Sequence, residues 1–185
     1  MIQLEMRKRR LPDLLTASRA LIAVAILGLI PAGPGALRSV ALLLLLGWTT
    51  DMLDGRVARR LEKEPTWIGE HEFQFDMLMV LASAIYLIAV GLVPPAVGIP
   101  YLALAVPLSL LINIRSEEFL RFKALTMLLA FPWVFAPFIV AYFHQRQAAY
   151  LGLLWMVTAL VLDWKRFTGV VGDFLSGARA FLRRS

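Results

Sequence analysis

The chain has 185 residues, of which 59% are hydrophobic and 17% charged, and its formal net charge is +6. Soluble domains average roughly 45–50% apolar and 25% charged residues, so this composition indicates a membrane protein. Because there is no cysteine, a disulfide framework and a thiolate metal site are both excluded. The length suits one domain over residues 1–185.

Six stretches approach the roughly 20 apolar residues that a membrane-spanning helix needs. In chain order they cover residues 14–32, 36–57, 72–93, 96–114, 119–143 and 148–164. The prolines inside them are expected to kink helices rather than end them, since neighbouring helices can satisfy the freed backbone groups. The expected fold is an all-α membrane protein, a six-transmembrane-helix bundle.

The two flanks of this bundle are basic and partly apolar. Residues 1–10 and 170–184 suit amphipathic helices on the cytoplasmic surface, with frayed basic tails as the alternative. A basic start before an apolar run is also typical of a signal peptide. Because Arg19 interrupts that run and further spans follow, we interpret it as a retained helix.

Lysine and arginine indicate the orientation of the bundle. Most of them flank one side, whereas the other side carries only Arg38 and Arg146. The positive-inside rule therefore predicts a multi-pass protein of the cell (inner) membrane with both termini cytoplasmic. Topology and anionic lipid account for the net charge, so no nucleic-acid partner is expected.

Four carboxylates lie at the predicted cytoplasmic ends of the second and third spans. Asp51 and Asp54 are three residues apart, and Glu72 and Asp76 are four apart, so each pair shares a helix face. A short loop joins the two helices, so all four can converge. Acidic residues in a span usually mark a functional site, and hard cations such as Mg²⁺ or Mn²⁺ prefer clustered oxygen ligands.

The residues after Asp54 suit a diphosphate beside such a metal. Gly55 and Ala58 keep one helix face shallow, and Arg59 can neutralise a phosphate oxygen. The alternative is structural: Asp51 and Asp54 only pair with nearby arginines at the membrane boundary, the candidates being Arg19, Arg56 and Arg59.

The pattern resembles the signature of the CDP-alcohol phosphatidyltransferases, D-x2-D-G-x2-A-R-x8-G-x3-D-x3-D. Its first half matches in register from Asp51 to Arg59, and Asp76 falls on the last aspartate. LPDLLTASR at 11–19 is similar to the P-N-x-L-T-x-x-R opening of the phosphatidylglycerophosphate and cardiolipin synthase branches.

The rest departs from the family pattern at three positions. Ile68 stands where glycine is expected, with Gly69 one place later, Glu72 replaces an aspartate, and Asp13 replaces the asparagine. An extra methylene shifts a carboxylate by more than about 1 Å, and positioned catalysis is sensitive to such shifts. A weak or inactive relative that binds lipid or nucleotide is therefore the alternative to an enzyme.

The resemblance implies phospholipid biosynthesis: transfer of a phosphatidyl group from CDP-diacylglycerol to an alcohol, with release of CMP. It also implies two divalent cations, Mg²⁺ or Mn²⁺, a general base at Asp76, and a homodimer. The implied metal ligands are Asp51, Asp54, Glu72 and Asp76. The implied nucleotide and diphosphate contacts are Thr16, Asp54, Gly55, Ala58, Arg59 and Gly69.

The acceptor is indicated only by basic residues near the junction of the fourth and fifth spans. Arg115, Arg121 and Lys123 suit a phosphorylated alcohol such as glycerol 3-phosphate, although they also simply obey the positive-inside rule. A small divalent-metal transporter subunit is the other class considered. The last three spans have no acidic residue before Asp163, so no acidic route across the membrane is visible.

Overall fold

The computed structural model describes residues 2–60, 66–115 and 119–182, and all regular structure within these ranges is helical. The elements in chain order are α1 (Ile2–Gly28), the 3₁₀ helix η1 (Ile30–Ala36), α2 (Leu37–Arg60), α3 (Trp67–Glu70), α4 (Glu72–Ala89), α5 (Pro95–Arg115), α6 (Phe119–His144), α7 (Arg146–Leu162) and α8 (Trp164–Leu182).

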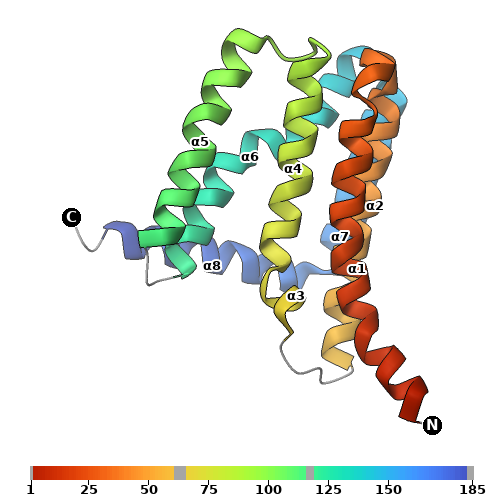
Figure 1. The fold of residues 1–185 in the computed structure, drawn as a ribbon, viewed down its shortest axis with the longest axis vertical. Coiled ribbons are helices and arrows are strands. Elements are labelled where there is room, and N and C mark those ends of the chain that lie inside the picture. The colour runs from red at the N-terminus through yellow and green to blue at the C-terminus, as the bar shows by residue number, and fades with distance from the viewer. Residues whose placement is uncertain (1, 61–65, 116–118, 183–185) are drawn as a thin grey trace.

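The long helices form an up-and-down bundle (Figure 1). Helix α1 packs against both α2 and α4, α4 packs against α6, and α6 contacts α5, α7 and α8. The connections through η1 and between α4 and α5 lie at the upper end of the bundle in Figure 1, whereas α3 and α8 lie at the lower end. The lower end therefore brings together the starts of α4 and α6 and the second half of α2.

Two glycines make the upper turns possible. Gly33 in η1 has a φ of 69° and Gly91 after α4 has a φ of 76°, a region that glycine enters without steric cost. The amides of Leu92 and Val93 both donate to the carbonyl of Leu87, at 2.9 and 3.0 Å, which closes the end of α4. Gly33 lies between two predicted spans, whereas Gly91 ends α4 at Ala89, before the end of the span predicted at 72–93.

The prolines within the apolar segments do not interrupt the helices. Helix α5 continues through Pro100 and Pro107, and α6 continues through Pro132 and Pro137. The prediction that prolines inside spans leave the helices continuous is therefore confirmed.

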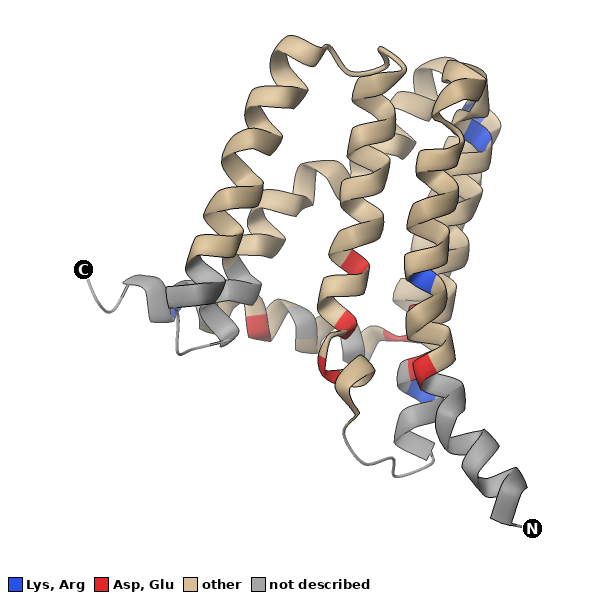
Figure 2. Cartoon of the chain, viewed as in Figure 1, with Lys and Arg blue, Asp and Glu red and all other residues tan. Residues whose placement is uncertain are grey.

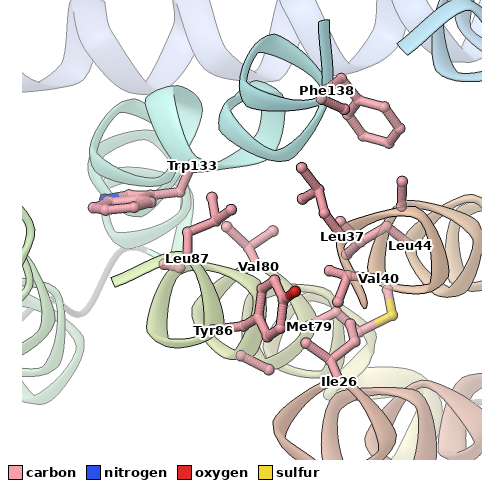
Figure 3. Close-up of a cluster of buried hydrophobic side chains, with 14 of the residues drawn as sticks. Ile26, Leu37, Val40, Leu44, Met79, Val80, Tyr86, Leu87, Trp133 and Phe138 are labelled. Carbon is pink, nitrogen blue, oxygen red and sulfur yellow. The ribbon is translucent and has the colours of Figure 1, made fainter. Parts of the chain in front are cut away.

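Buried apolar side chains from α1, α2, α4 and α6 fill the middle of the bundle (Figure 3). Small residues allow the helices to approach closely. A Cβ at Gly47 would collide with the thioether of Met79, and one at Gly152 would collide with the ring of Phe138. The Tyr86 hydroxyl donates to the Gly33 carbonyl at 2.8 Å and so ties α4 to η1.

The outer surface is also apolar, as a lipid-facing surface is. Three described segments are long and apolar enough to cross a membrane: Ile30–Asp54, Glu72–Ala89 and Leu125–His144. A fourth span results if Arg146–Leu162 and Phe167–Ser176, bent by 88° to each other, are counted as one. The segment Pro95–Leu111 is apolar but shorter. The described helices therefore indicate a membrane protein with three or four candidate spans, and the count of six stays a prediction.

The terminal flanks differ from each other. The N-terminal flank is not a separate helix, because α1 runs without a break from Ile2 to Gly28. Pro12 is the only strong helix breaker in the sequence between flank and span, and a helix can continue through one proline. The described part of the C-terminal flank belongs to α8, which begins earlier, at Trp164, and crosses the lower end of the bundle in Figure 1.

Candidate active site

Charged residues gather at the lower end of the bundle, and the upper half is almost free of them among the described residues (Figure 2). Three helices supply this cluster. Helix α1 contributes Arg19, α2 contributes Asp51 and Asp54, and α4 contributes Glu72 and Asp76. The i,i+3 and i,i+4 spacings on α2 and α4 place each acidic pair on the face that meets α1.

Arg19 lies at the centre of the cluster and is fully buried. Its Nη1 atom lies 2.7 Å from Asp76 Oδ1 and 3.2 Å from Asp51 Oδ1, and its Nη2 atom pairs with Asp54 Oδ2. One guanidinium thus joins carboxylates from two other helices. Sequence reasoning weighed Arg19 only as one of three possible partners for Asp51 and Asp54, and its one distinguishing signal was a charge inside an apolar run.

Asp54 is the most deeply buried of the four carboxylates, with 4% of its side chain exposed. The Thr16 hydroxyl donates to Asp54 Oδ2 at 2.9 Å, on the same oxygen that Arg19 contacts. Thr16 therefore lies beside the cluster, on the same face of α1 as Arg19.

The other three carboxylates form a group open enough for a cation. Asp51, Glu72 and Asp76 each offer an oxygen, and these oxygens lie within 4.8 Å of one another. Hard divalent cations bind oxygen at about 2.0–2.6 Å, so ligands on opposite sides of one ion lie up to about 5 Å apart. The donor set therefore fits one divalent cation, and the longer side chain of Glu72 still reaches the group.

The charge count favours a bound cation. Among the described residues, the cluster contains four carboxylates and one guanidinium, and Asp51, Glu72 and Asp76 are only partly buried. Like charges in a low-dielectric setting repel strongly unless a counter-charge is present. A divalent ion bound by Asp51, Glu72 and Asp76 would supply such a counter-charge.

Two departures from the signature have local structural roles. The Thr66 hydroxyl donates to Asp13 Oδ1 at 2.7 Å, which links α1 to the turn before α4. The same Thr66 oxygen accepts from the Gly69 amide at 3.2 Å and caps α3. Asp13 and Gly69 thus hold the loop that leads into Glu72.

Several predicted site residues fall outside what the structure describes. Gly55, Ala58 and Arg59 lie on α2, but their side chains are not among the described ones. The same holds for the basic residues assigned to the acceptor, Arg115, Arg121 and Lys123.

Arg56 lies apart from the cluster. Its Nε atom is 3.8 Å from Asp163 Oδ2, and its Nη2 donates to the Leu162 carbonyl at 3.3 Å. Arg56 therefore ties α2 to the end of α7 and does not pair with Asp51 or Asp54.

Comparison with known proteins adds one match. The family model described as CDP-alcohol phosphatidyltransferase matches residues 9–137, which include α2, α3, α4 and α5 and the whole carboxylate cluster. Searches of curated proteins and of solved structures found no match.

The buried Arg19 contacts lead to a stability prediction. Arg19→Gln leaves three carboxylates without their guanidinium, and removing one partner of a buried ion pair costs about 3–5 kcal/mol. We expect a clear loss of thermal stability of the purified protein in detergent. Added Mg²⁺ should recover more stability in the variant than in the wild type, because the substitution removes one positive charge from the cluster.

Arg56→Gln is the matched control. That arginine is 35% exposed and its nearest carboxylate contact is long, so its loss should cost less than about 1 kcal/mol. Equal stability of the Arg19 and Arg56 variants would contradict the central role of Arg19.

Proposed function

The chain belongs to the CDP-alcohol phosphatidyltransferase family, and on that premise we propose that it transfers a phosphatidyl group from CDP-diacylglycerol to an alcohol and releases CMP. The observation that carries the proposal is the convergence of Asp51, Asp54, Glu72 and Asp76 at one end of the bundle, within the segment that the family model matches. Acidic clusters of this kind suit the binding of a metal-bound diphosphate.

Asp51, Glu72 and Asp76 would hold a divalent cation, Mg²⁺ or Mn²⁺. Such a cation offsets the charge of the diphosphate and of the leaving CMP. The family resemblance implies two cations, and the second would also need Asp54, whose Oδ2 contacts Arg19 and Thr16. We therefore assign the first position to the three-carboxylate group, and expect the second to depend on oxygens of the bound diphosphate.

Asp76 is our assignment for the general base. Arg19 contacts it through Oδ1, and Oδ2 is the oxygen that would take the proton of the acceptor hydroxyl. The guanidinium holds this carboxylate in place from α1, so the base and the cation ligands keep a fixed spacing.

The nucleotide would lie along α2 and α1. Gly55 and Ala58 would leave room for the cytidine diphosphate, Arg59 would contact a phosphate oxygen, and Thr16 would fix Asp54. Gly69 would act through the capped turn before Glu72.

For the acceptor we propose a phosphorylated alcohol, with glycerol 3-phosphate as the first candidate. Arg115 at the end of α5 and Arg121 and Lys123 in the first turns of α6 would supply cations for its phosphate.

An activity assay tests this function. Purified protein with CDP-diacylglycerol, Mg²⁺ or Mn²⁺ and a panel of alcohols should release CMP, with glycerol 3-phosphate the best acceptor. Asp76→Asn should reduce the rate by at least about 100-fold, since it removes the base and a cation ligand. Asp173→Asn on α8, an exposed position, is the control. No CMP release with any acceptor from folded protein would favour an inactive, ligand-binding relative.

The variant Glu72→Asp tests whether glutamate, in place of the aspartate of the signature, supports the site or weakens it. Because the Glu72 carboxylate already reaches Asp51 and Asp76, shortening it should withdraw a ligand by about 1 Å and lower the rate, by up to about 100-fold. Faster CMP release by this variant would show instead that glutamate weakens the site.

We also propose that the bundle crosses the membrane six times, with both termini and the carboxylate cluster at the cytoplasmic face. Two copies of the chain would form a homodimer. Mass measurement of the detergent complex tests the dimer. The cysteine-free chain allows a direct topology test at Gly35 in η1 and Gly169 in α8, where an added side chain meets nothing within 4 Å.

In whole cells, an impermeant thiol reagent should label Gly35→Cys and spare Gly169→Cys. The reverse pattern would contradict the proposed orientation. Labelling of both would show that α8 and η1 lie on the same side.

A further inference from the structure

A second ligand site is suggested by a cavity of about 260 Å³ between α4, α5 and α6. Met77 and Ala84 line it from α4, Ala105 and Ser109 from α5, and Thr126 and Trp133 from α6. Successive helix residues turn by 100°, so Met77 lies about 140° around α4 from Glu72. The cavity therefore lies against the opposite face of α4 from the carboxylate cluster.

The cavity contains buried polar atoms that lack a partner. Gln74 Oε1, Thr126 Oγ1 and Trp133 Nε1 have no hydrogen-bond partner among the residues that the structure describes. All three residues line the cavity, and Thr126 and Trp133 are only 9% and 7% exposed. Leaving such a group unsatisfied costs about 1–3 kcal/mol, so three around one cavity indicate a ligand that binds them.

The arrangement of the two donors on α6 favours an elongated ligand. Thr126 and Trp133 are two turns apart, about 10 Å along the helix. Large helical side chains lean toward the helix N-terminus. The Trp133 ring accordingly packs edge-on against Tyr101, whose hydroxyl donates to the Leu129 carbonyl at 2.8 Å, one turn earlier. The two donors thus follow one strip of α6, and the Trp133 side chain leans toward the turn nearer Thr126.

The lining indicates what kind of ligand this is. None of the described lining side chains is charged, and almost all are apolar. Leu78 and Leu110, which are 42% and 55% exposed, bring the cavity to the outer apolar surface of the bundle. A ligand can enter there from the lipid phase. Ligand pockets usually measure roughly 300–1,000 Å³, so this smaller volume suits one chain rather than a whole two-chain lipid.

We propose that the α4–α5–α6 cavity binds one ester-linked acyl chain of a membrane lipid, with the ester region accepting hydrogen bonds from Thr126 and Trp133. The Gln74 side-chain amide lines the same cavity and, according to its rotation, presents an N–H or an oxygen to the ligand. This site does not depend on the proposed transfer reaction, although α4 carries residues of both sites.

Photolabelling of the full chain in phosphatidylcholine nanodiscs tests the proposal. Two probes are compared: a phosphatidylcholine with an ester-linked, diazirine-bearing acyl chain, and its ether-linked analogue, which lacks the carbonyls. The readout is the label recovered in residues 74–84, 102–110 and 126–133, measured by mass spectrometry. In the wild type the ester probe should label these segments at least about fivefold more than the ether probe, the factor for one hydrogen bond of about 1 kcal/mol.

Two variants, each with a matched control, make the test specific. Ala105→Leu fills the cavity and should reduce the labelling to background, whereas Ala103→Leu, exposed on the same helix, should leave it unchanged. Thr126→Val removes one donor with little change of shape and should lower ester labelling toward the ether value. Thr158→Val is its control, because that exposed hydroxyl bonds the carbonyl of Leu154 in its own helix.

Three results would overturn the proposal. The first is equal labelling by the ester and ether probes in the wild type, and the second is labelling that Ala105→Leu does not change. The third is crosslinking of the cavity segments to a second copy of the chain in place of the lipid. None of these readouts depends on CMP release, so the lipid site and the transferase activity can fail independently.

Discussion

A guanidinium with no solvent exposure, held by carboxylates from two neighbouring helices, is the interaction on which the lower half of this bundle depends. Arg19 brings α1, α2 and α4 into one fixed arrangement through its contacts with Asp51, Asp54 and Asp76. Burying charge is costly unless each group has partners, and Arg19 supplies one to three of the carboxylates. The oxygens that Asp51, Glu72 and Asp76 offer within 4.8 Å of one another are what makes the cluster suited to a cation.

Helix α4 joins two different environments. One of its faces carries Glu72 and Asp76 toward the charged cluster. The other lines an apolar cavity, where polar atoms of Gln74, Thr126 and Trp133 have no partner in the part of the chain that the structure describes. The same helix therefore lines a charged cluster and an apolar cavity at once.

The helices could be predicted from the sequence because apolar runs and turn residues alternate clearly. The span predicted at 119–143, for example, corresponds to α6 at Phe119–His144. The count of six membrane crossings stays a prediction, since three described segments are long and apolar enough to span and a fourth requires α7 and α8 to be counted together. The angle between those helices, 88° between their main segments, depends on packing.

At the site, spacing alone predicted that Asp51, Asp54, Glu72 and Asp76 share helix faces, and the structure brings them together. The central position of Arg19 could not be derived in the same way. Of the two candidate arginines whose side chains the structure describes, the packing of α1 against α2 and α4 brings Arg19 to the carboxylates, whereas Arg56 contacts Asp163. The cavity behind α4 depends on three helices at once and has no signal in the local pattern.

The most direct test of this account is Mn²⁺ binding to the purified protein, followed by electron paramagnetic resonance without any substrate. We predict at least one tightly bound Mn²⁺ per chain, lost in Glu72→Gln and retained in Glu70→Gln, since Glu70 lies on α3 outside the ligand group. Folded wild-type protein that binds no more Mn²⁺ than the Glu72→Gln variant would contradict the claim that this cluster is a cation site.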